Sequence, residues 1–346
     1  MSTIGVGLLG AGPVVQAIHL PTLARITDLF TVRTIMDVDP AIAGSVAARV
    51  GARPVTTVDD LLTDPAVEVV AICSPSQFHA EQVIAAMRAG KRAVLCEKPF
   101  AVDHDEAERI AAVSAETGVP VIVGAMHAFD PAWLAAADAW GDLPTSAHTI
   151  RSRIVLPPNS RFEDFATEVI TRPDFPAPDL DDPDVRAGMI SGGVLGLAIH
   201  NLPLARTFVP DAAEIAVSLG RVLTPFGYLI DLTAGDRTVQ LIGAMNDRWE
   251  PSWSFQVFSD DAELTVWFPP SYVQAGSATA VLRRGGETRV FGPFDHNGYE
   301  GEWRTLADIV RGDSRRAPTL DALIDDLVFA VDIAEAAATA ARQEHA

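Results

Sequence analysis

LLGAGPVV, residues 8–15, joins an apolar run to an amphipathic segment and decides the first part of the fold. Residues 4–10 form an uninterrupted apolar run, which predicts a strand buried on both faces. The apolar spacing over residues 13–25 predicts a helix. Gly10 permits a tight turn out of the strand, and Gly12 lets the main chain approach a ligand closely. The stretch therefore predicts a strand–turn–helix unit.

The same alternation of strand and helix continues to about residue 125. Further Val/Ile-rich runs predict strands over residues 31–37, 67–73, 92–97 and 119–125. Amphipathic patterns between them predict helices over residues 40–50, 77–90 and 103–118. Because uninterrupted apolar strands that alternate with helices form parallel sheets covered on both faces, we expect an α/β Rossmann domain over residues 1–125.

The pattern changes after residue 125. Alternating apolar and polar residues predict an antiparallel sheet with one solvated face. The strands are expected over residues 148–156, 214–223, 228–234, 238–245, 252–259, 262–268 and 278–285. Helices are expected at 130–140 and 320–343, and the acidic, proline-rich residues 161–188 predict a long loop that could cover a site. We therefore expect an α+β domain over residues 126–346 with a large open, mainly antiparallel sheet, whose last helix packs back towards the first domain.

Composition excludes several classes of function. The 346 residues carry a formal net charge of −20, which argues against a nucleic-acid or anionic-membrane partner. No apolar run is long enough to cross a bilayer, and residues 1–12 lack the features of a signal peptide. The two cysteines, Cys73 and Cys96, form neither a disulfide framework nor a metal cluster, so we expect a reduced, cytoplasmic protein without a bound metal.

Residues Gly10, Gly12 and Val15 form a G-x-G-x-x-V motif between the expected strand and helix. In such a turn the unpaired N–H groups of the helix N-terminus face the phosphates of a dinucleotide. Val15 stands where Gly or Ala is usual, so the helix and strand should pack less closely. We expect four residues of this turn to bind a dinucleotide: Gly10, Gly12, Pro13 and Val14.

Asp37 ends the second expected strand. Its separation along the chain from the glycine-rich motif is typical of an acidic residue that binds the ribose 2′-hydroxyl. A carboxylate repels a 2′-phosphate, and residues 38–42 contain no Arg or Lys to receive one. The sequence therefore favours NAD over NADP. The alternative is that Asp37 is only a turn residue of the DVDP segment.

Five ordered motifs together resemble the Gfo/Idh/MocA oxidoreductases, the family of glucose–fructose oxidoreductase and inositol dehydrogenase. The motifs are GLLGAGPVVQAIHLPTL (7–23), AICSPSQFHAEQVIAAMRAGK (71–91), VLCEKPFA (94–101), FDPAW (129–133) and SGGVLGLAIH (191–200). The resemblance implies an NAD(H)-dependent dehydrogenase or reductase that transfers a hydride between nicotinamide and a hydroxyl of a sugar, cyclitol or related polyol. The open face of the expected second sheet is of a kind that often forms an oligomer interface, so we expect a homodimer or homotetramer.

The resemblance assigns the chemistry to the EKP segment. Lys98 would relay the proton of the reacting hydroxyl or stabilise the developing oxyanion, as a positioned amine can. Glu97 would hold the nicotinamide side of the cofactor or pair with Lys98, and Pro99 would fix the turn, through a cis bond if one is present. The alternative for Glu97 and Lys98 is a solvated ion pair at a strand end.

The resemblance also places SPSQFH (74–79) beside the ribose and nicotinamide. The expected cofactor contacts are Ser74, Pro75, Gln77 and His79. The usual pattern has Asn where this chain has Ser76, so that contact is altered. The alternative is a helix N-cap at Ser76 with His79 in the first turn.

The substrate motif departs from the family pattern. His200 stands where the family has its His, and we expect it to act as a general acid–base. Gly196 replaces the family's Asp four residues earlier, a spacing that would place both residues on one helix face. His127, which follows a strand end, and Arg186 are the expected further substrate contacts. Because the carboxylate is lost at Gly196, a dinucleotide-binding sensor or regulator stays open as an alternative. A further alternative is an NAD-using glycoside-cleaving or eliminating enzyme.

Overall fold

The computed structural model describes residues 2–165, 167, 178–211, 213–246, 250–274 and 276–343. The chain divides into two compact units. The first unit comprises Met1–Gly124, Phe162–Arg172 and Tyr299–Leu327, and the second comprises Ala125–Arg161, Pro173–Gly298 and Val328–Ala346. The chain therefore returns to the first unit after residue 298, a segment that the sequence pattern had grouped with the second domain.

The first unit contains a six-stranded sheet in the order β3-β2-β1-β4-β5-β6, with every pairing parallel. The strands are β1 (Ile4–Leu9), β2 (Phe30–Met36), β3 (Arg53–Val55), β4 (Val69–Ile72), β5 (Ala93–Cys96) and β6 (Val121–Val123). Strands β1, β4 and β5 are buried along their whole length, as uninterrupted apolar runs predict. This confirms the expected α/β Rossmann fold. Of the six strands, the sequence pattern missed only β3, which is short.

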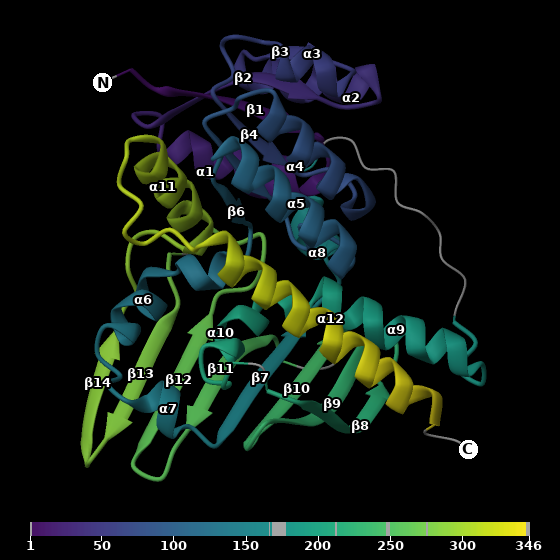
Figure 1. Cartoon of the computed structure of the whole chain (residues 1–346), viewed down its shortest axis with the longest axis vertical. Helices are drawn as coiled ribbons and strands as arrows, with labels where there is room; N and C mark the ends of the chain where they lie inside the picture. The colour runs from purple at the N-terminus through teal and green to yellow at the C-terminus, as the bar shows by residue number, and fades with distance from the viewer. Residues whose placement is uncertain are drawn as a thin grey trace. The chain divides into compact units, whose positions relative to one another are not determined.

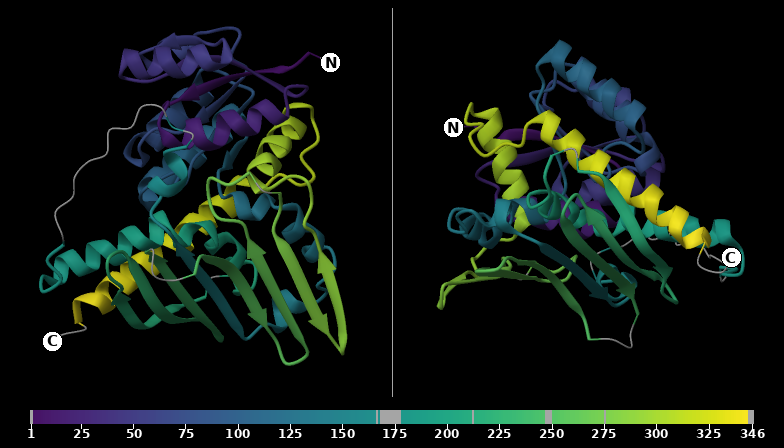
Figure 2. Two further views of the ribbon diagram at one scale, coloured as in Figure 1. Left: turned by 180° about the vertical axis from the view of Figure 1, so that it is seen from behind. Right: turned by 60° about the horizontal axis from the view of Figure 1, so that its bottom comes forward.

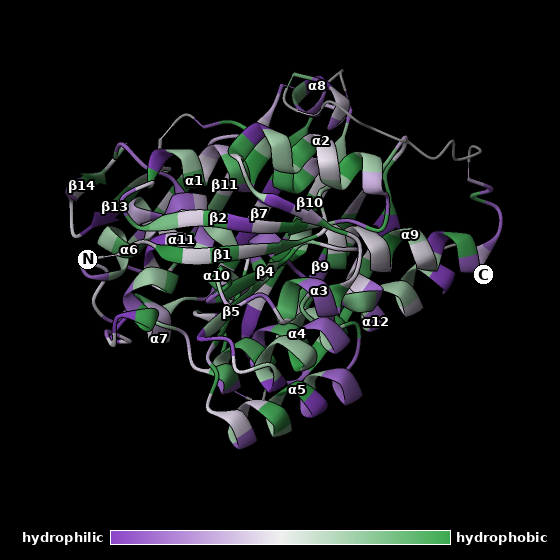
Figure 3. Ribbon diagram, turned by 90° about the horizontal axis from the view of Figure 1, so that it is seen from above, coloured by the Kyte–Doolittle hydropathy of each residue, from purple (hydrophilic) through white to green (hydrophobic). Residues whose placement is uncertain are grey.

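Helices and short turns connect these strands (Figure 1). They are η1 (Val15–His19), α1 (Leu20–Arg25), α2 (Pro40–Val50), α3 (Val58–Leu62), η2 (Ser76–Phe78), α4 (His79–Arg88) and α5 (His104–Thr117). Side-chain caps begin two of the longer helices: the carboxylates of Asp39 and Asp103 accept hydrogen bonds from the N–H groups of Ala41 and Glu106. Figure 3 shows both apolar and polar residues on α4 and α5, as amphipathic helices have. The two helices pack against each other, and α4 also packs against β4 and β5.

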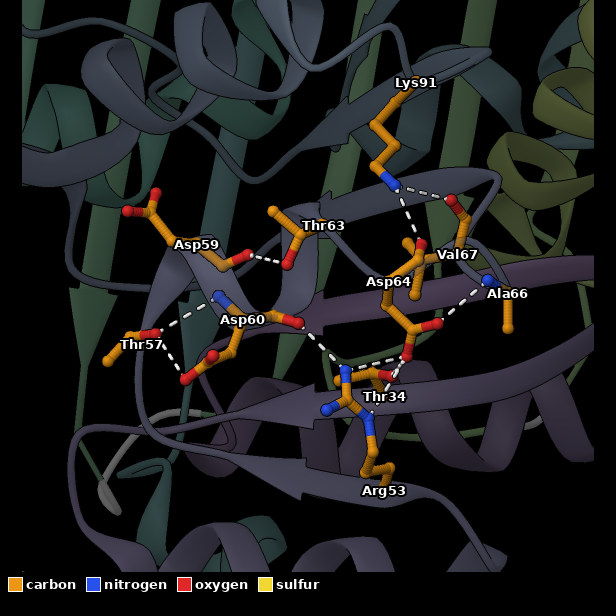
Figure 4. A network of polar contacts seen from close by, with 10 residues as sticks. All are labelled: Thr34, Arg53, Thr57, Asp59, Asp60, Thr63, Asp64, Ala66, Val67 and Lys91. Carbon is orange, nitrogen blue, oxygen red and sulfur yellow. Dashed lines mark hydrogen bonds and ion pairs between the residues drawn. The ribbon is translucent and has the colours of Figure 1, made fainter.

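A polar network joins the loops that lead into β4 and β5 (Figure 4). The Nζ atom of Lys91 donates to the carbonyl oxygens of Asp64 and Val67, at 3.2 and 2.8 Å. The carboxylate of Asp64 accepts from Thr34 Oγ1 at 2.7 Å and from Arg53 Nη2 at 2.9 Å. Ligands of parallel sheets bind at the carboxyl ends of the strands, whereas this network lies at the opposite ends. We therefore interpret the buried Lys91 as structural.

The second unit contains an eight-stranded sheet in the order β14-β13-β12-β11-β7-β10-β9-β8. Its strands are β7 (Thr149–Leu156), β8 (Ile215–Val222), β9 (Gly227–Ala234), β10 (Arg237–Met245), β11 (Ser252–Phe258), β12 (Ala262–Phe268), β13 (Thr279–Arg284) and β14 (Glu287–Phe291). Only the β7–β10 pairing is parallel. The expected mainly antiparallel sheet is confirmed. Figure 2 shows it from the face on which no described helix lies.

The remaining helices follow the chain order η3 (Met126–Phe129), α6 (Pro131–Ala137), α7 (Leu143–Ser146), α8 (Ser160–Glu163), α9 (Pro183–Gly196), η4 (Ala198–His200), α10 (Leu202–Arg206), α11 (Gly298–Val310) and α12 (Leu320–Gln343). The expected loop over residues 161–188 is wrong at both ends. Helix α8 includes residues 161–163, and α9 begins at Pro183, where the Asp182 carboxylate accepts a hydrogen bond from the N–H of Asp184. The centre of the expected cover, residues 168–177, lies outside the described residues. Among described residues, no helix is long and apolar enough to span a membrane.

Candidate active site

The glycine-rich turn lies between β1 and the helical residues that begin at Pro13. Gly10 has a φ of +95°, and a Cβ atom there would lie 2.8 Å from the carbonyl oxygen of Cys73. Only glycine fits this position without strain. A Cβ atom at Gly12 would instead meet no heavy atom within 4 Å. The turn therefore leaves open space at Gly12, as the close approach of a pyrophosphate requires.

The carboxylate of Asp37 is held beside this turn. Its Oδ2 atom accepts a hydrogen bond from the N–H of Ala11 at 2.9 Å, and its Oδ1 atom accepts one from the N–H of Asp39 at 3.0 Å. The structure thus brings Asp37 to the glycine-rich turn, and one of its oxygens also stabilises the following turn. Both interpretations of Asp37 that the sequence allowed are compatible with this geometry.

The loop after β4 holds two of its four candidate residues by hydrogen bonds. Ser74 Oγ donates to the side-chain oxygen of Gln82 at 2.7 Å, and both ring nitrogens of His79 contact main-chain oxygens. Pro75 and Gln77 are exposed. His79 is the first residue of α4, and no side chain caps that helix, so Ser76 is not its N-cap. Because His79 is buried and both of its nitrogens are engaged, the structure does not support the expected direct contact with a cofactor.

Glu97 pairs with a histidine that the sequence pattern did not identify. His19 Nε2 lies 3.0 Å from Glu97 Oε1, and Trp303 Nε1 donates to His19 Nδ1 at 3.2 Å. An indole N–H can only donate, so His19 Nδ1 is the acceptor of that hydrogen bond. The Nε2–H group of His19 then donates a hydrogen bond to Glu97 Oε1. Figure 1 shows α11, which contains Trp303, beside α1, which follows His19.

The surroundings keep Glu97 ionised. Burial opposes its charged form, but the hydrogen bond and the electrostatic interaction with His19, and then the charge of Lys98, outweigh burial and hold the pKa of Glu97 below its ordinary value. A Cβ atom at Gly124 would lie 3.2 Å from the Glu97 carboxylate, so the glycine makes room for it. Burial lowers the pKa of Lys98, and the Glu97 carboxylate limits that shift. The Lys98–Pro99 peptide bond is cis.

Glu302 is a second buried carboxyl group near Glu97. Both of its carboxyl oxygens lack a hydrogen-bond partner within the part of the chain that the structure describes. Burial raises the pKa of Glu302 well above its ordinary value, and the charge of Glu97 raises it further. Since two adjacent buried carboxylates repel one another, Glu302 holds the proton and Glu97 holds the charge. Nothing in the sequence of α11 distinguishes Glu302 from the other acidic residues, so its protonated state could not be predicted.

We expect Glu302→Gln to stabilise the first unit, and to do so more as the pH rises. A group whose pKa is raised by folding contributes stability that is complete below its unfolded pKa and is lost as the pH rises through its folded pKa. Glutamine resembles the protonated acid and does not titrate, so the variant should be more stable by about 1–3 kcal/mol at pH 7 and equal to wild type near pH 4. Urea unfolding at several pH values measures the difference.

Glu300→Gln, on the same helix, is the matched control. The Glu300 carboxylate binds Arg25 and Arg304. Burial opposes its charge, but these hydrogen bonds hold the pKa of Glu300 below its ordinary value, so its loss should lower stability at neutral pH. A Glu302→Gln protein less stable than wild type at pH 7 would show that Glu302 is ionised in the folded state.

In the second unit, His127 lies in a buried network of aromatic and amide groups. Asn201 Oδ1 accepts from Trp253 Nε1 at 3.2 Å and lies 2.7 Å from His127 Nδ1. Asn201 Nδ2 donates to Ser152 Oγ at 2.9 Å. The indole can only donate, which fixes the orientation of the Asn201 amide, so His127 Nδ1 must carry a proton. The His127 ring also stacks on Phe268, with centroids 3.6 Å apart.

The proton state of His127 follows from this network. Burial lowers the pKa of His127 to about 3, and the hydrogen bond with Asn201 only partly opposes that shift. His127 is thus neutral near pH 7, with a proton on Nδ1 and a bare lone pair on Nε2. It can accept a hydrogen bond from a ligand hydroxyl but cannot supply a proton or a positive charge. The sequence indicated His127 as a site residue, whereas its proton state depends on Asn201 and Trp253.

His200 lies near His127, with ring centroids 6.2 Å apart. Its Nδ1 atom lies 3.1 Å from Met126 Sδ, and its ring contacts the edge of Trp253. The prediction that positions 196 and 200 lie on one face of a single helix is wrong, because α9 ends at Gly196 and His200 belongs to the separate turn η4. A Cβ atom at Gly196 would meet nothing within 4 Å, so the backbone leaves room for the carboxylate that this chain lacks.

Arg186 does not join this cluster of imidazoles. Its guanidinium donates to the main-chain oxygens of Leu180 at 2.7 Å, Asp181 at 3.1 Å and Ala341 at 3.2 Å. The side chain is buried and links the start of α9 to the end of α12. The structure gives Arg186 a structural role and does not support the expected substrate contact.

Comparison with known proteins gives one family match. Residues 4–125 match a family described as "Oxidoreductase family, NAD-binding Rossmann fold". Inositol 2-dehydrogenase 3 of Saccharopolyspora erythraea is 33% identical over 160 residues, which cover 45% of this chain and 47% of that protein. An inositol 2-dehydrogenase of Mycolicibacterium smegmatis is 32% identical over 166 residues, covering 46% and 47%. The match spans about half the length of these curated relatives.

Solved structures share the fold along nearly the whole chain. A 3-ketoreductase from Actinomadura kijaniata in complex with NADP has a TM-score of 0.70 at 21% identity and covers 97% of this chain and 96% of its own. A UDP-N-acetylglucosamine 3-dehydrogenase from Acidithiobacillus ferrooxidans has a TM-score of 0.72 at 19% identity, with coverage of 99% and 100%. At these identities the likeness establishes the fold of both units, and residues 4–125 match a family whose description names NAD binding.

Proposed function

We propose, from the premise that residues 4–125 belong to the Gfo/Idh/MocA oxidoreductase family, that this chain is an NAD(H)-dependent dehydrogenase or reductase of neutral polyols. The observation that carries the proposal is the Glu97–Lys98 turn at the carboxyl end of β5. Its carboxylate is fixed by His19, and burial lowers the pKa of its lysine. A lysine whose pKa is shifted towards the working pH is suited to accept and return a proton.

The residues of the first unit fit a bound dinucleotide. The open space at Gly12 admits a pyrophosphate, Gly10 permits the turn, and Pro13 and Val14 begin the helix whose N–H groups would bind it. We propose Asp37 as the acceptor of the ribose 2′-hydroxyl. Ser74, Pro75 and Gln77 are the proposed contacts nearer the nicotinamide. When bound, the nicotinamide cofactor supplies the hydride acceptor.

We propose that Lys98 handles the proton. Oxidation of an alcohol breaks one C–H bond, whose hydrogen leaves with its electron pair, and one O–H bond, whose hydrogen leaves as a proton. In its neutral form the Lys98 amine would accept that proton, and in the reverse direction the ammonium would return it. The ionised Glu97 would stabilise the ammonium form, as opposite charges do.

His127 and His200 are the proposed substrate contacts. His127 offers a bare Nε2 lone pair, so it suits the O–H group of a neutral sugar or cyclitol better than a carboxylate, which has no proton to donate. The guanidinium of Arg186, which could have bound an anion, contacts main-chain oxygens instead. We therefore propose neutral polyols rather than sugar acids, with His200 as an additional acid–base group.

Reduction of NAD and NADP, followed by absorbance in the presence of inositols, neutral sugars and sugar acids, tests this function. We expect turnover with neutral polyols and NAD, and at least tenfold lower kcat/KM with NADP, because the Asp37 carboxylate repels a 2′-phosphate. A preference for sugar acids would contradict the role of His127. Measurable NAD binding without turnover on any compound would favour a sensor or an enzyme that retains its cofactor.

We extend the proposal to a cytoplasmic homodimer or homotetramer. Cys73 and Cys96 are free and buried, which suits a reducing compartment. The large apolar side chains of Trp267 and Val290, in the eight-stranded sheet, are exposed. Exposed apolar patches often mark a protein–protein interface, which supports an oligomer. The acidic charge supports neither a nucleic-acid nor a membrane partner.

A further inference from the structure

His79 is a buried titratable side chain to which the proposed reaction gives no role. It is the first residue of α4, and both its ring nitrogens lie 2.7 Å from main-chain carbonyl oxygens. Nδ1 contacts the oxygen of Pro99, after β5, and Nε2 contacts the oxygen of Ser74, after β4. The ring therefore bridges two loops at the carboxyl ends of neighbouring strands.

The two contacts determine how many protons the ring carries. A carbonyl oxygen can only accept a hydrogen bond, and a neutral imidazole has one N–H group and one bare lone pair. A neutral His79 would therefore direct one lone pair at a carbonyl oxygen 2.7 Å away, and the two would repel. Only an imidazolium, with N–H groups at both nitrogens, donates to both oxygens.

We propose that His79 is an imidazolium that clamps the loops after β4 and β5 and thereby positions Lys98. Pro99, whose oxygen it binds, follows Lys98 directly in the chain. Small displacements of a proton-transfer group lower its effectiveness strongly. His79 is thus a positioning residue, which acts through the Lys98–Pro99 segment without contact with a ligand. The part of the inference that concerns Lys98 rests on the proposed function.

Three effects oppose the clamp. Burial disfavours a charged ring, as it does for His127, and the ammonium of Lys98, next to Pro99, repels a second cation. The positive end of the α4 dipole disfavours a cation at the first residue of the helix. Charge-assisted hydrogen bonds are shorter and stronger than neutral ones, and His79 makes two, each at 2.7 Å. The ionisable groups of the adjoining segments are Glu81 in the first turn of α4, Cys73 after β4, and Glu97 and Lys98 after β5. Of these, the Glu97 carboxylate favours a cation in this region, whereas Lys98 disfavours one, and Glu81 is ion-paired with Arg109 of α5.

Histidine-selective ¹⁵N labelling and long-range ¹H–¹⁵N spectra at neutral pH test the proton count. We expect both His79 nitrogens to resonate as protonated nitrogens, and the signals to vanish in His79→Gln. His19 and His127 serve as internal references, because their partners leave one protonated nitrogen each, Nε2 and Nδ1 respectively. A single protonated nitrogen on His79 would overturn the proposal. If His79→Gln does not fold, connectivities within labelled wild type supply the assignment.

A second experiment tests the positioning of Lys98. We expect His79→Gln to lower kcat about tenfold with little change in KM for the polyol, since the proposed substrate contacts lie elsewhere. We also expect faster hydrogen exchange in residues 94–101. His104→Gln is the matched control, because His104 is the exposed first residue of α5. Unchanged kcat and unchanged exchange in His79→Gln would overturn the positioning role. The spectra and the exchange remain informative if wild type turns over no polyol, so the two proposals can fail separately.

Discussion

Lys98→Met is expected to lower kcat for polyol oxidation by about 10²–10⁴-fold, the range that a positioned general acid–base supplies. Methionine keeps most of the length and the apolar stem of lysine but can neither accept nor return a proton. The folded first unit should tolerate the change, since removal of this half-buried amine also removes a desolvation cost. The rate of reduced-nicotinamide formation under saturating cofactor measures the loss.

Lys91→Met is the control for this substitution. Lys91 is another lysine of the first unit whose pKa is lowered mainly by burial. Its Nζ, however, donates to the carbonyl oxygens of Asp64 and Val67. We expect its loss to lower stability, because two buried carbonyl groups lose their partner, and to leave kcat nearly unchanged. A Lys98→Met enzyme that keeps kcat within a few-fold of wild type would exclude Lys98 as the proton relay.

Gly12→Val is expected to weaken NAD binding by about 100-fold without loss of stability. A Cβ atom at Gly12 would meet no protein atom within 4 Å, so the folded chain accommodates a side chain there. The same side chain would occupy the space that a pyrophosphate must enter. Overpacking costs about 1–3 kcal/mol, or about 5–150-fold in affinity, and we expect the upper part of this range because valine is bulky. Calorimetric titration with NAD and thermal unfolding measure the two quantities.

Gly10→Ala separates the two glycines of the motif. A Cβ atom at Gly10 would lie 2.8 Å from the carbonyl oxygen of Cys73, and the φ of +95° disfavours any side chain. We therefore expect Gly10→Ala to lower the stability of the fold, whether or not NAD is bound. If Gly12→Val binds NAD as wild type does, the open space at the turn is not the phosphate site.

The fold was largely predictable from local patterns. Burial of a strand on both faces requires an uninterrupted apolar run, and β1, β4 and β5 have one. Strands β3 and β14 were missed because β3 has three residues and β14 is mostly exposed, so neither shows a clear pattern. The start of α9 was misjudged because an Asp–Pro pair signals a helix N-terminus as well as a loop.

The candidate site was predictable only in part. The glycine-rich turn, Asp37 and the EKP segment have local signatures, because each lies where a strand ends and the chain must turn. Arg186 and His79 were assigned ligand contacts that the structure does not support, since both are buried against main-chain oxygens. His19, Trp303 and Glu302 were not identified, although His19 lies on the helical segment that follows the glycine-rich turn.

The sequence by itself determined the order of the strands along the chain, the glycine-rich turn after β1 and the EKP segment that carries Lys98. The tertiary structure decided the charge of each buried group. Trp303 is 284 residues from His19 along the chain, and Asn201 is 74 residues from His127, yet these partners decide which nitrogen carries the proton. A titratable side chain takes the form that its hydrogen-bond partners and its burial stabilise, and those partners come together only when distant segments fold against one another.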